Sequence, residues 1–170
     1  MRLELTRHPD FTCRAVDRIE VELAWPAPGT LSLRYMVRGA IADIVLAPVS
    51  APERSDELWR TTCFEAFVAE AGGAYTEFNF APSTQWAAYH FDGYRAGMQN
   101  AWAWPSIKVT NEPRQFELQA SLRLPAHAAR LGLTAVIEEA GGAQSYWALQ
   151  HPPGRPDFHH SDSFAYELSP

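Results

Sequence analysis

Cysteine is scarce in this sequence of 170 residues, where only Cys13 and Cys63 occur. Two cysteines argue against a disulfide framework, and they lack the CxxC spacing that is typical of a metal site. Because free cysteine is among the most buried residue types, we expect both thiols to be buried. The length suits one domain with a full hydrophobic core, so we expect a single domain over residues 1–170.

Clusters of basic residues and long apolar runs are also missing. The formal net charge is -6 at pH 7, and no concentration of Lys and Arg suggests a phosphate-binding surface. No stretch approaches the ~20 apolar residues of a membrane-spanning helix. The N-terminal stretch MRLELTRHPDF lacks the apolar run of a secretory signal. We therefore expect a soluble, cytoplasmic protein that binds neither nucleic acids nor membranes.

What the sequence does contain is alternation of apolar and polar residues with the period of a β-strand, over residues 16–25, 30–39 and 114–125. Shorter strand candidates cover residues 2–7, 43–46, 86–91, 107–110, 133–138, 145–149 and 164–168. Residues 125–132 predict a short helix, because proline begins the segment and glycine ends it. Together these patterns predict an all-β fold, namely an antiparallel, jelly-roll-like β-sandwich with one or two short helices.

The segment LWRTTCFEAFVAEAGGAYTEFNFAPS, residues 58–83, predicts a hairpin whose two strands are joined by a turn at residues 71–74. A helix is the alternative for its first half, because Ala and Glu favour helices while aromatic residues and Val favour strands. As strands, the two arms bury one face, which consists of Phe64, Ala66, Val68, Thr76, Phe78 and Phe80. The opposite face consists of Cys63, Glu65, Phe67, Tyr75, Glu77 and Asn79.

Glu65, Glu77 and Asn79 give this second face two carboxylates and a carboxamide beside aromatic rings. Cross-strand neighbours lie within ~5 Å directly and ~7–8 Å diagonally, so the two carboxylates repel unless a cation or a ligand compensates them. The cations on other predicted strands that could do so are Arg34, Arg38 and Arg123. A plain solvent-facing sheet surface is the alternative interpretation.

Aromatic and polar side chains together suit a sugar, which presents C–H bonds on its ring faces and hydroxyl groups around its rim. Trp59 precedes the first arm, where its ring could form a binding platform. Glu65 and Glu77 could accept hydrogen bonds from hydroxyl groups, and Asn79 could both donate and accept.

The stretches LWRTTCFEAFV and YTEFNFAPS resemble the paired-strand signature of family-nine carbohydrate-binding modules and the related DOMON-like domains. STQWAAYHFDGYRAGM and YWALQHPPGRPDFHHSDSFAYEL are similar to a group of bacterial DOMON-like proteins. The resemblance implies a β-sandwich in which two tryptophans enclose a sugar and acidic or amide side chains hold its hydroxyl groups. By position it implies binding roles for Trp59, Glu65 and Asn79, with Trp147 as the second tryptophan.

Two other functions stay open. Some DOMON relatives bind haem through Met and His, and the residues that could hold haem or a metal ion here are Met36, Met98, His151, His159 and His160. Glu65 and Glu77 could instead be the acid–base pair of a glycoside-processing enzyme, although no GxSxG or HExxH motif accompanies them.

Non-catalytic binding of a small carbohydrate or glycoconjugate, without a cofactor, is the function that we expect. His159 could line the same site, because Pro-rich loops at the ends of sandwiches often carry binding groups. The expected ligand-binding residues are Trp59, Glu65, Glu77, Asn79, Trp147 and His159.

Overall fold

The computed structural model describes residues 1–168, which form strands joined by turns and short 3₁₀ segments. The strands are β1 (Arg2–Arg7), β2 (Val16–Ala27), β3 (Thr30–Gly39), β4 (Cys63–Glu70), β5 (Tyr75–Phe80), β6 (Trp86–Phe91), β7 (Gln99–Asn100), β8 (Ser106–Glu112), β9 (Gln115–Arg123), β10 (Ala128–Glu138), β11 (Gln144–Ala148) and β12 (Tyr166–Glu167). The 3₁₀ segments are η1 (Ile41–Asp43), η2 (Leu58–Arg60) and η3 (Ser161–Ser163). The all-β prediction is therefore confirmed.

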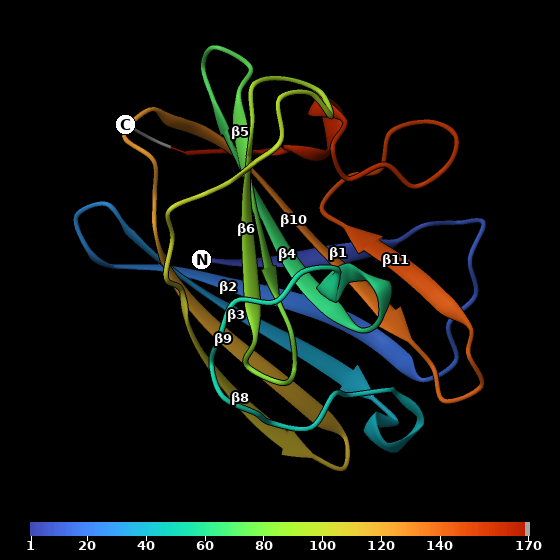
Figure 1. The fold of residues 1–170 in the computed structure, drawn as a ribbon. Helices are drawn as coiled ribbons and strands as arrows, with labels where there is room; N and C mark the ends of the chain where they lie inside the picture. Colours follow the sequence, from blue (N-terminus) through green and yellow to red (C-terminus); the bar gives the residue numbers. More distant parts are fainter. Residues whose placement is uncertain (169–170) are drawn as a thin grey trace.

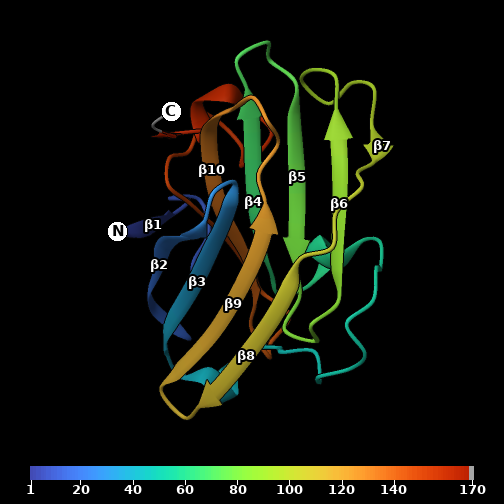
Figure 2. The same cartoon turned by 90° about the vertical axis from the view of Figure 1, so that its left-hand side faces the viewer.

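The strands form one curled antiparallel sheet in the order β7-β6-β5-β4-β10-β11-β1-β2-β3-β9-β8, with β12 paired to β10. The curl arises at β1, whose residues 2–5 pair with β2 while residues 6–7 pair with β11. As a result β2, β3, β9 and β8 face β10, β4, β5 and β6 as two layers (Figures 1 and 2). The expected sandwich-like architecture is thus present.

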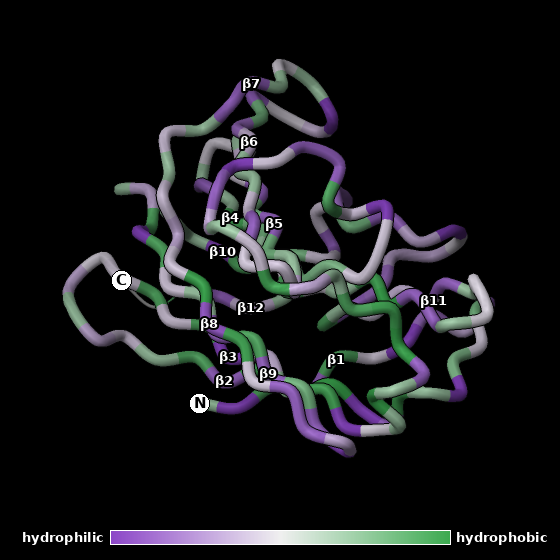
Figure 3. Tube along the Cα trace, turned by 60° about the horizontal axis from the view of Figure 1, so that its bottom comes forward, coloured by the Kyte–Doolittle hydropathy of each residue, from purple (hydrophilic) through white to green (hydrophobic). Residues whose placement is uncertain are grey.

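The central hydrophobic core lies between the two layers, where the strands of both layers direct apolar side chains inward. A second, smaller apolar cluster lies on the other face of β4, β5, β6 and β10. Short hydrophobic and hydrophilic stretches follow one another along the strands in Figure 3. At the centre, the ring of Phe64 lies 5.2 Å from that of Tyr35 and 5.8 Å from that of Phe116, measured between centroids. These contacts join β4 to β3 and β9 across the core.

The predicted helix at residues 125–132 is wrong. Residues 125–128 form a turn in which the Ala128 amide donates to the Pro125 carbonyl, and β10 begins at Ala128. Residues 130–131 then pair with both β4 and β12, and this tertiary pairing outweighs the local helix signal. No α-helix occurs within residues 1–168, so none there is long and apolar enough to cross a membrane.

Two smaller expectations also differ from the structure. Residues 43–46 form the end of η1 and a single bridge from Ile44 to Glu139 rather than a strand. Cys63 is buried as expected, whereas Cys13 is only partly buried.

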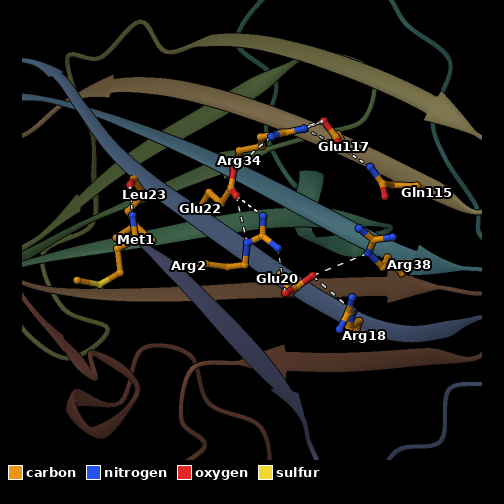
Figure 4. Close-up of polar contacts among 10 residues, drawn as sticks. All are labelled: Met1, Arg2, Arg18, Glu20, Glu22, Leu23, Arg34, Arg38, Gln115 and Glu117. Carbon is orange, nitrogen blue, oxygen red and sulfur yellow. Dashed lines mark hydrogen bonds and ion pairs between the residues drawn. The ribbon is translucent and has the colours of Figure 1, made fainter.

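Charged residues cover the outer face of β2, β3 and β9, on the side of this layer that faces away from the core (Figure 4). Arg34 bonds Glu117 at 2.7 Å and Glu22 at 3.2 Å, and Arg38 lies 3.9 Å from Glu20. Arg123 ends β9 in the same layer. The expectation that these three arginines could compensate Glu65 and Glu77 is therefore wrong, because the hydrophobic core separates the two faces.

Candidate functional site

The hairpin of β4 and β5 has the two faces that its alternation predicted. Phe64, Ala66, Val68, Phe78 and Phe80 belong to the central core. On the other face Glu65 pairs with Asn79 and Phe67 pairs with Glu77. The two glutamates are therefore diagonal neighbours across the strand pair, on the side of the sheet away from the core.

This face forms the floor of an open cavity of about 1110 Å³. Its side walls come from β6, β10 and β11, from η2 and from residues 156–159. Aromatic side chains dominate these walls and comprise Trp59, Phe67, Tyr89, Phe91, Tyr146 and Phe158. The cavity can therefore enclose a ligand with apolar faces while its floor offers hydrogen-bonding groups.

Glu65 is anchored from both sides of the sheet. Its backbone carbonyl accepts a hydrogen bond of 2.7 Å from the Tyr35 hydroxyl in the core, and its Oε2 accepts one of 2.8 Å from Thr134 Oγ1. The side chain is only 3% exposed. Burial, with repulsion from Glu77 second, raises the pKa of Glu65 to about 8, so near pH 7 this carboxyl group is mostly protonated.

Glu77 is held by Asn79, whose Nδ2 donates a hydrogen bond of 2.7 Å to Glu77 Oε1. Asn79 is fully buried and also accepts a contact of 3.6 Å from the Cys63 thiol. Burial raises the pKa of Glu77, while the Asn79 hydrogen bond and the charge of Arg95 act against that rise. Asn79 therefore orients Glu77 from the same face of β5.

His159 covers one side of the floor. Its Nδ1 lies 2.8 Å from the Tyr75 hydroxyl and its Nε2 lies 3.7 Å from Glu77 Oε2. Burial, with the nearby charge of Arg95, lowers the pKa of His159 to about 4, so the ring is neutral at pH 7. The imidazole also meets the rings of Phe67 and Phe91 edge-on at 5.3 and 5.2 Å.

Ion pairs surround the mouth of the cavity. They are Arg54–Asp56 at 2.9 Å, Arg60–Glu57 at 2.7 Å and Arg95–Asp157 at 2.9 Å. The Tyr89 hydroxyl donates a hydrogen bond of 2.6 Å to Asp56, which fixes the ring of Tyr89 in the wall. Trp59 is 47% exposed, with the Arg60 guanidinium over its ring at 5.4 Å.

Of the six residues predicted for the site, the structure brings Trp59, Glu65, Glu77 and His159 together in the cavity lining. Asn79 shares this face of β5 but is fully buried outside the cavity lining, and it reaches the cavity through Glu77. Trp147 is placed elsewhere: it packs in the central core, is 6% exposed and donates from Nε1 to Ser145 Oγ at 3.0 Å. Its indole therefore does not face Trp59 across the cavity.

Sequence reasoning missed Tyr146, which lines the cavity where Trp147 was expected. Neighbouring residues on a strand point to opposite faces, so only one of the two can face the site. Val136 pairs with both Cys63 and Tyr146, which places Tyr146 on the same face as Cys63 and Glu65. The pairing of β10 with β4 and β11 decides this, and no short motif in the sequence signals it.

The residues considered as ligands of a metal ion do not form a cluster in the described part of the chain. No group of three or more His, Cys, Asp or Glu there is arranged to hold a metal ion. Met98 and His159 both line the cavity, but His159 directs Nδ1 to Tyr75 and Nε2 toward Glu77. Nδ1 of this imidazole is therefore occupied by Tyr75, whereas Nε2 has no hydrogen bond within residues 1–168.

Comparison with known proteins identifies a similar fold but no protein family. No protein-family model matches the chain, and no curated protein matches it. Among solved structures, the fold is similar to that of a "putative carbohydrate-binding protein" from Bacteroides uniformis, with a TM-score of 0.61 and 14% sequence identity. The match covers 98% of this chain and 84% of that chain. At this identity the likeness shows a shared fold.

Proposed function

We propose that this protein binds a small carbohydrate or glycoconjugate without catalysis, in the cavity above β4 and β5. The observation that carries the proposal is the pair of buried carboxyl groups, Glu65 and Glu77, on the floor of a cavity that aromatic rings also line. Buried polar groups cost free energy unless they find hydrogen-bonding partners. Such a floor favours a ligand rich in hydroxyl groups over a purely apolar ligand.

Trp59 supplies the exposed platform of the proposed site, and Tyr146 and Phe91 supply further ring surface in place of Trp147. A contact between one ring and one sugar face is worth about 1–3 kcal/mol, comparable to burial of an apolar side chain. Glu65, when protonated, both donates and accepts, and Glu77 accepts while Asn79 holds it in place. His159 lies beside Glu77 and closes the side of the site.

Two independent resemblances support the proposal. The paired strands at residues 58–83 resemble those of family-nine carbohydrate-binding modules and DOMON-like domains. The structural neighbour from Bacteroides uniformis is itself described as carbohydrate-binding. We assign this protein to the same broad class of sugar-binding β-sandwich domains.

A glycoside-processing reaction is the second candidate, and one observation favours it. Burial keeps Glu65 largely protonated near pH 7 beside the second carboxyl group of Glu77. A protonated carboxyl group next to another carboxyl group is the arrangement that glycosidases use for general acid catalysis.

Isothermal titration calorimetry with mono- and disaccharides, amino sugars included, tests the binding function, and chromogenic glycosides test turnover. We expect saturable binding of at least one sugar with modest affinity, and no release of the chromophore. Absence of binding throughout the panel at millimolar concentration would overturn the proposal. Chromophore release that disappears in both Glu65→Gln and Glu77→Gln would replace it with the enzymatic function.

A further inference from the structure

We propose that the ligand of this cavity carries a protonated amino group, and that Glu65 and Glu77 hold this group at the floor. The inference rests on the proposed function and narrows its ligand to an amino sugar or an amine-bearing glycoconjugate. It depends on the distribution of charge around the cavity, on the burial of the two carboxyl groups and on the rings beside them.

The arginines at the mouth of the cavity are already matched by acids. The three pairs are Arg54–Asp56, Arg60–Glu57 and Arg95–Asp157, with nitrogen–oxygen distances of 2.9, 2.7 and 2.9 Å. Each positive charge at the rim therefore has a negative partner within direct contact. None of these three arginines is therefore free to pair with the carboxyl groups of the floor.

The floor of the cavity differs from the rim, because neither Glu65 nor Glu77 has a cation in direct contact. Glu65 is 3% exposed and Glu77 is 6% exposed, yet both line the cavity. Glu65 Oε2 accepts from Thr134, while Oε1 has no hydrogen-bond partner within residues 1–168. Glu77 Oε1 accepts from Asn79, and its Oε2 faces His159 at 3.7 Å, which is beyond a hydrogen bond.

The groups packed around these acids do not supply the missing positive charge. The titratable groups that face them from the neighbouring elements are Tyr35, Cys63, Tyr75, Tyr89, Arg95 and His159. Arg95 is paired with Asp157. Burial keeps the pKa of His159 at about 4, and Tyr75 holds its Nδ1. A ligand cation would therefore be the first positive partner in direct contact with these carboxyl groups among the groups that the structure describes.

The rings beside the two carboxyl groups suit a cation as well. Phe67 and Phe91 line the cavity next to His159, and Tyr89 stands in the wall of β6. Aromatic faces attract ammonium groups, and they do so more strongly where water is excluded. Carboxylates combined with aromatic faces therefore favour an amine over an additional hydroxyl group.

Binding of an ammonium group should also release a proton from the protein, whereas binding of a neutral sugar should not. Glu65 holds a proton in the free protein near pH 7. When R–NH₃⁺ binds, the Glu65 carboxyl group loses this proton to solvent and the resulting carboxylate faces the ammonium group. The ligand keeps all three of its own protons, so up to one proton is released for each ligand bound.

The test is calorimetric titration near pH 7 with glucosamine, galactosamine and mannosamine, each beside its neutral parent hexose and its N-acetyl derivative. We expect at least one amino sugar to bind about tenfold or more tightly than both neutral counterparts. Its binding enthalpy should change with the ionisation enthalpy of the buffer, because a proton is released. In Glu65→Gln and Glu77→Gln the ratio of amino-sugar to parent affinity should fall toward one.

Glu112→Gln is the matched control, because it removes one acid from the exposed surface of β8 and should preserve the ratio. Neutral hexoses that bind as tightly as their amino counterparts would overturn the amine inference and leave the proposed function standing. Failure of all sugars, amino and neutral, together with failure of ethanolamine would overturn both. Ethanolamine is an additional probe: if it alone binds and releases a proton, the amine site stands and the sugar function fails.

Discussion

Nε2 of His159 lies 3.7 Å from Oε2 of Glu77, although the histidine comes from a loop near the end of the chain and the glutamate from the middle of β5. The same imidazole bonds the Tyr75 hydroxyl at 2.8 Å, across 84 positions of sequence. The loop that contains His159 therefore covers one side of the floor that the β4–β5 hairpin forms. Ligand recognition and the pH dependence of stability both involve this junction.

Replacing Trp59 by alanine should weaken sugar binding and leave the fold intact. The indole is 47% exposed at the cavity mouth, so its removal takes away ring surface worth about 1–3 kcal/mol to a sugar without opening the core. Calorimetry of the tightest-binding sugar and thermal unfolding measure the two effects. Trp102→Ala is the control, because Trp102 is 90% exposed and does not line the cavity. Equal affinities of the two variants would refute the role of Trp59.

Replacing Trp147 by alanine should have the opposite profile. This indole is 6% exposed within the central core, and its removal leaves a cavity that costs about 3–5 kcal/mol of unfolding free energy. Urea denaturation followed by circular dichroism measures the loss. A variant as stable as the wild type, with weakened sugar binding, would return Trp147 to the binding site.

The free energy of unfolding should decrease as pH rises from 6.5 toward 8. Glu65 has a pKa of about 8 in the folded state against 4.5 in the unfolded state, so the folded state binds more protons in this range. His159 has the opposite effect, but only between about 4 and 6.5, where the unfolded state binds more protons. Above pH 6.5 the decrease due to Glu65 is therefore uncompensated.

Glu65→Gln should flatten this decrease, because the amide is uncharged at every pH used. The variant should exceed the wild type in unfolding free energy above pH 8, by a difference on the order of 3–5 kcal/mol, and the difference should shrink toward pH 4.5. Denaturant titrations at a series of pH values measure it. Glu112→Gln, which removes an exposed acid, should retain the wild-type slope. Parallel curves for Glu65→Gln and the wild type would show that Glu65 titrates normally.

Gly132→Ala should destabilise the fold. A Cβ at this position of β10 would lie 2.9 Å from Phe164 Cδ1 and 3.0 Å from the Ser163 carbonyl oxygen. The ring of Phe164 packs against those of Phe67 and Tyr75. Such overpacking costs about 1–3 kcal/mol. Gly72→Ala is the matched control, because a Cβ there meets no atom within 4 Å. Thermal unfolding of both variants gives the comparison, and equal melting temperatures would contradict the predicted clash.

The sequence by itself determined the strands and the two faces of the central hairpin. The period of two assigned Phe64 and Phe78 to the core and Glu65 and Glu77 to the opposite face, because neighbouring side chains on a strand project in opposite directions. This rule is local, so it needs no knowledge of which strands are neighbours.

Only the tertiary structure decided which other groups meet those carboxyl groups. It placed Tyr146 rather than Trp147 in the cavity, brought His159 beside Glu77 and turned residues 128–132 into a strand. It also kept Arg34 on the far side of the molecule, where it pairs with Glu117. These outcomes depend on strand order and loop paths. Contacts between residues distant in sequence decide them, and single-strand periodicity carries no information about such contacts.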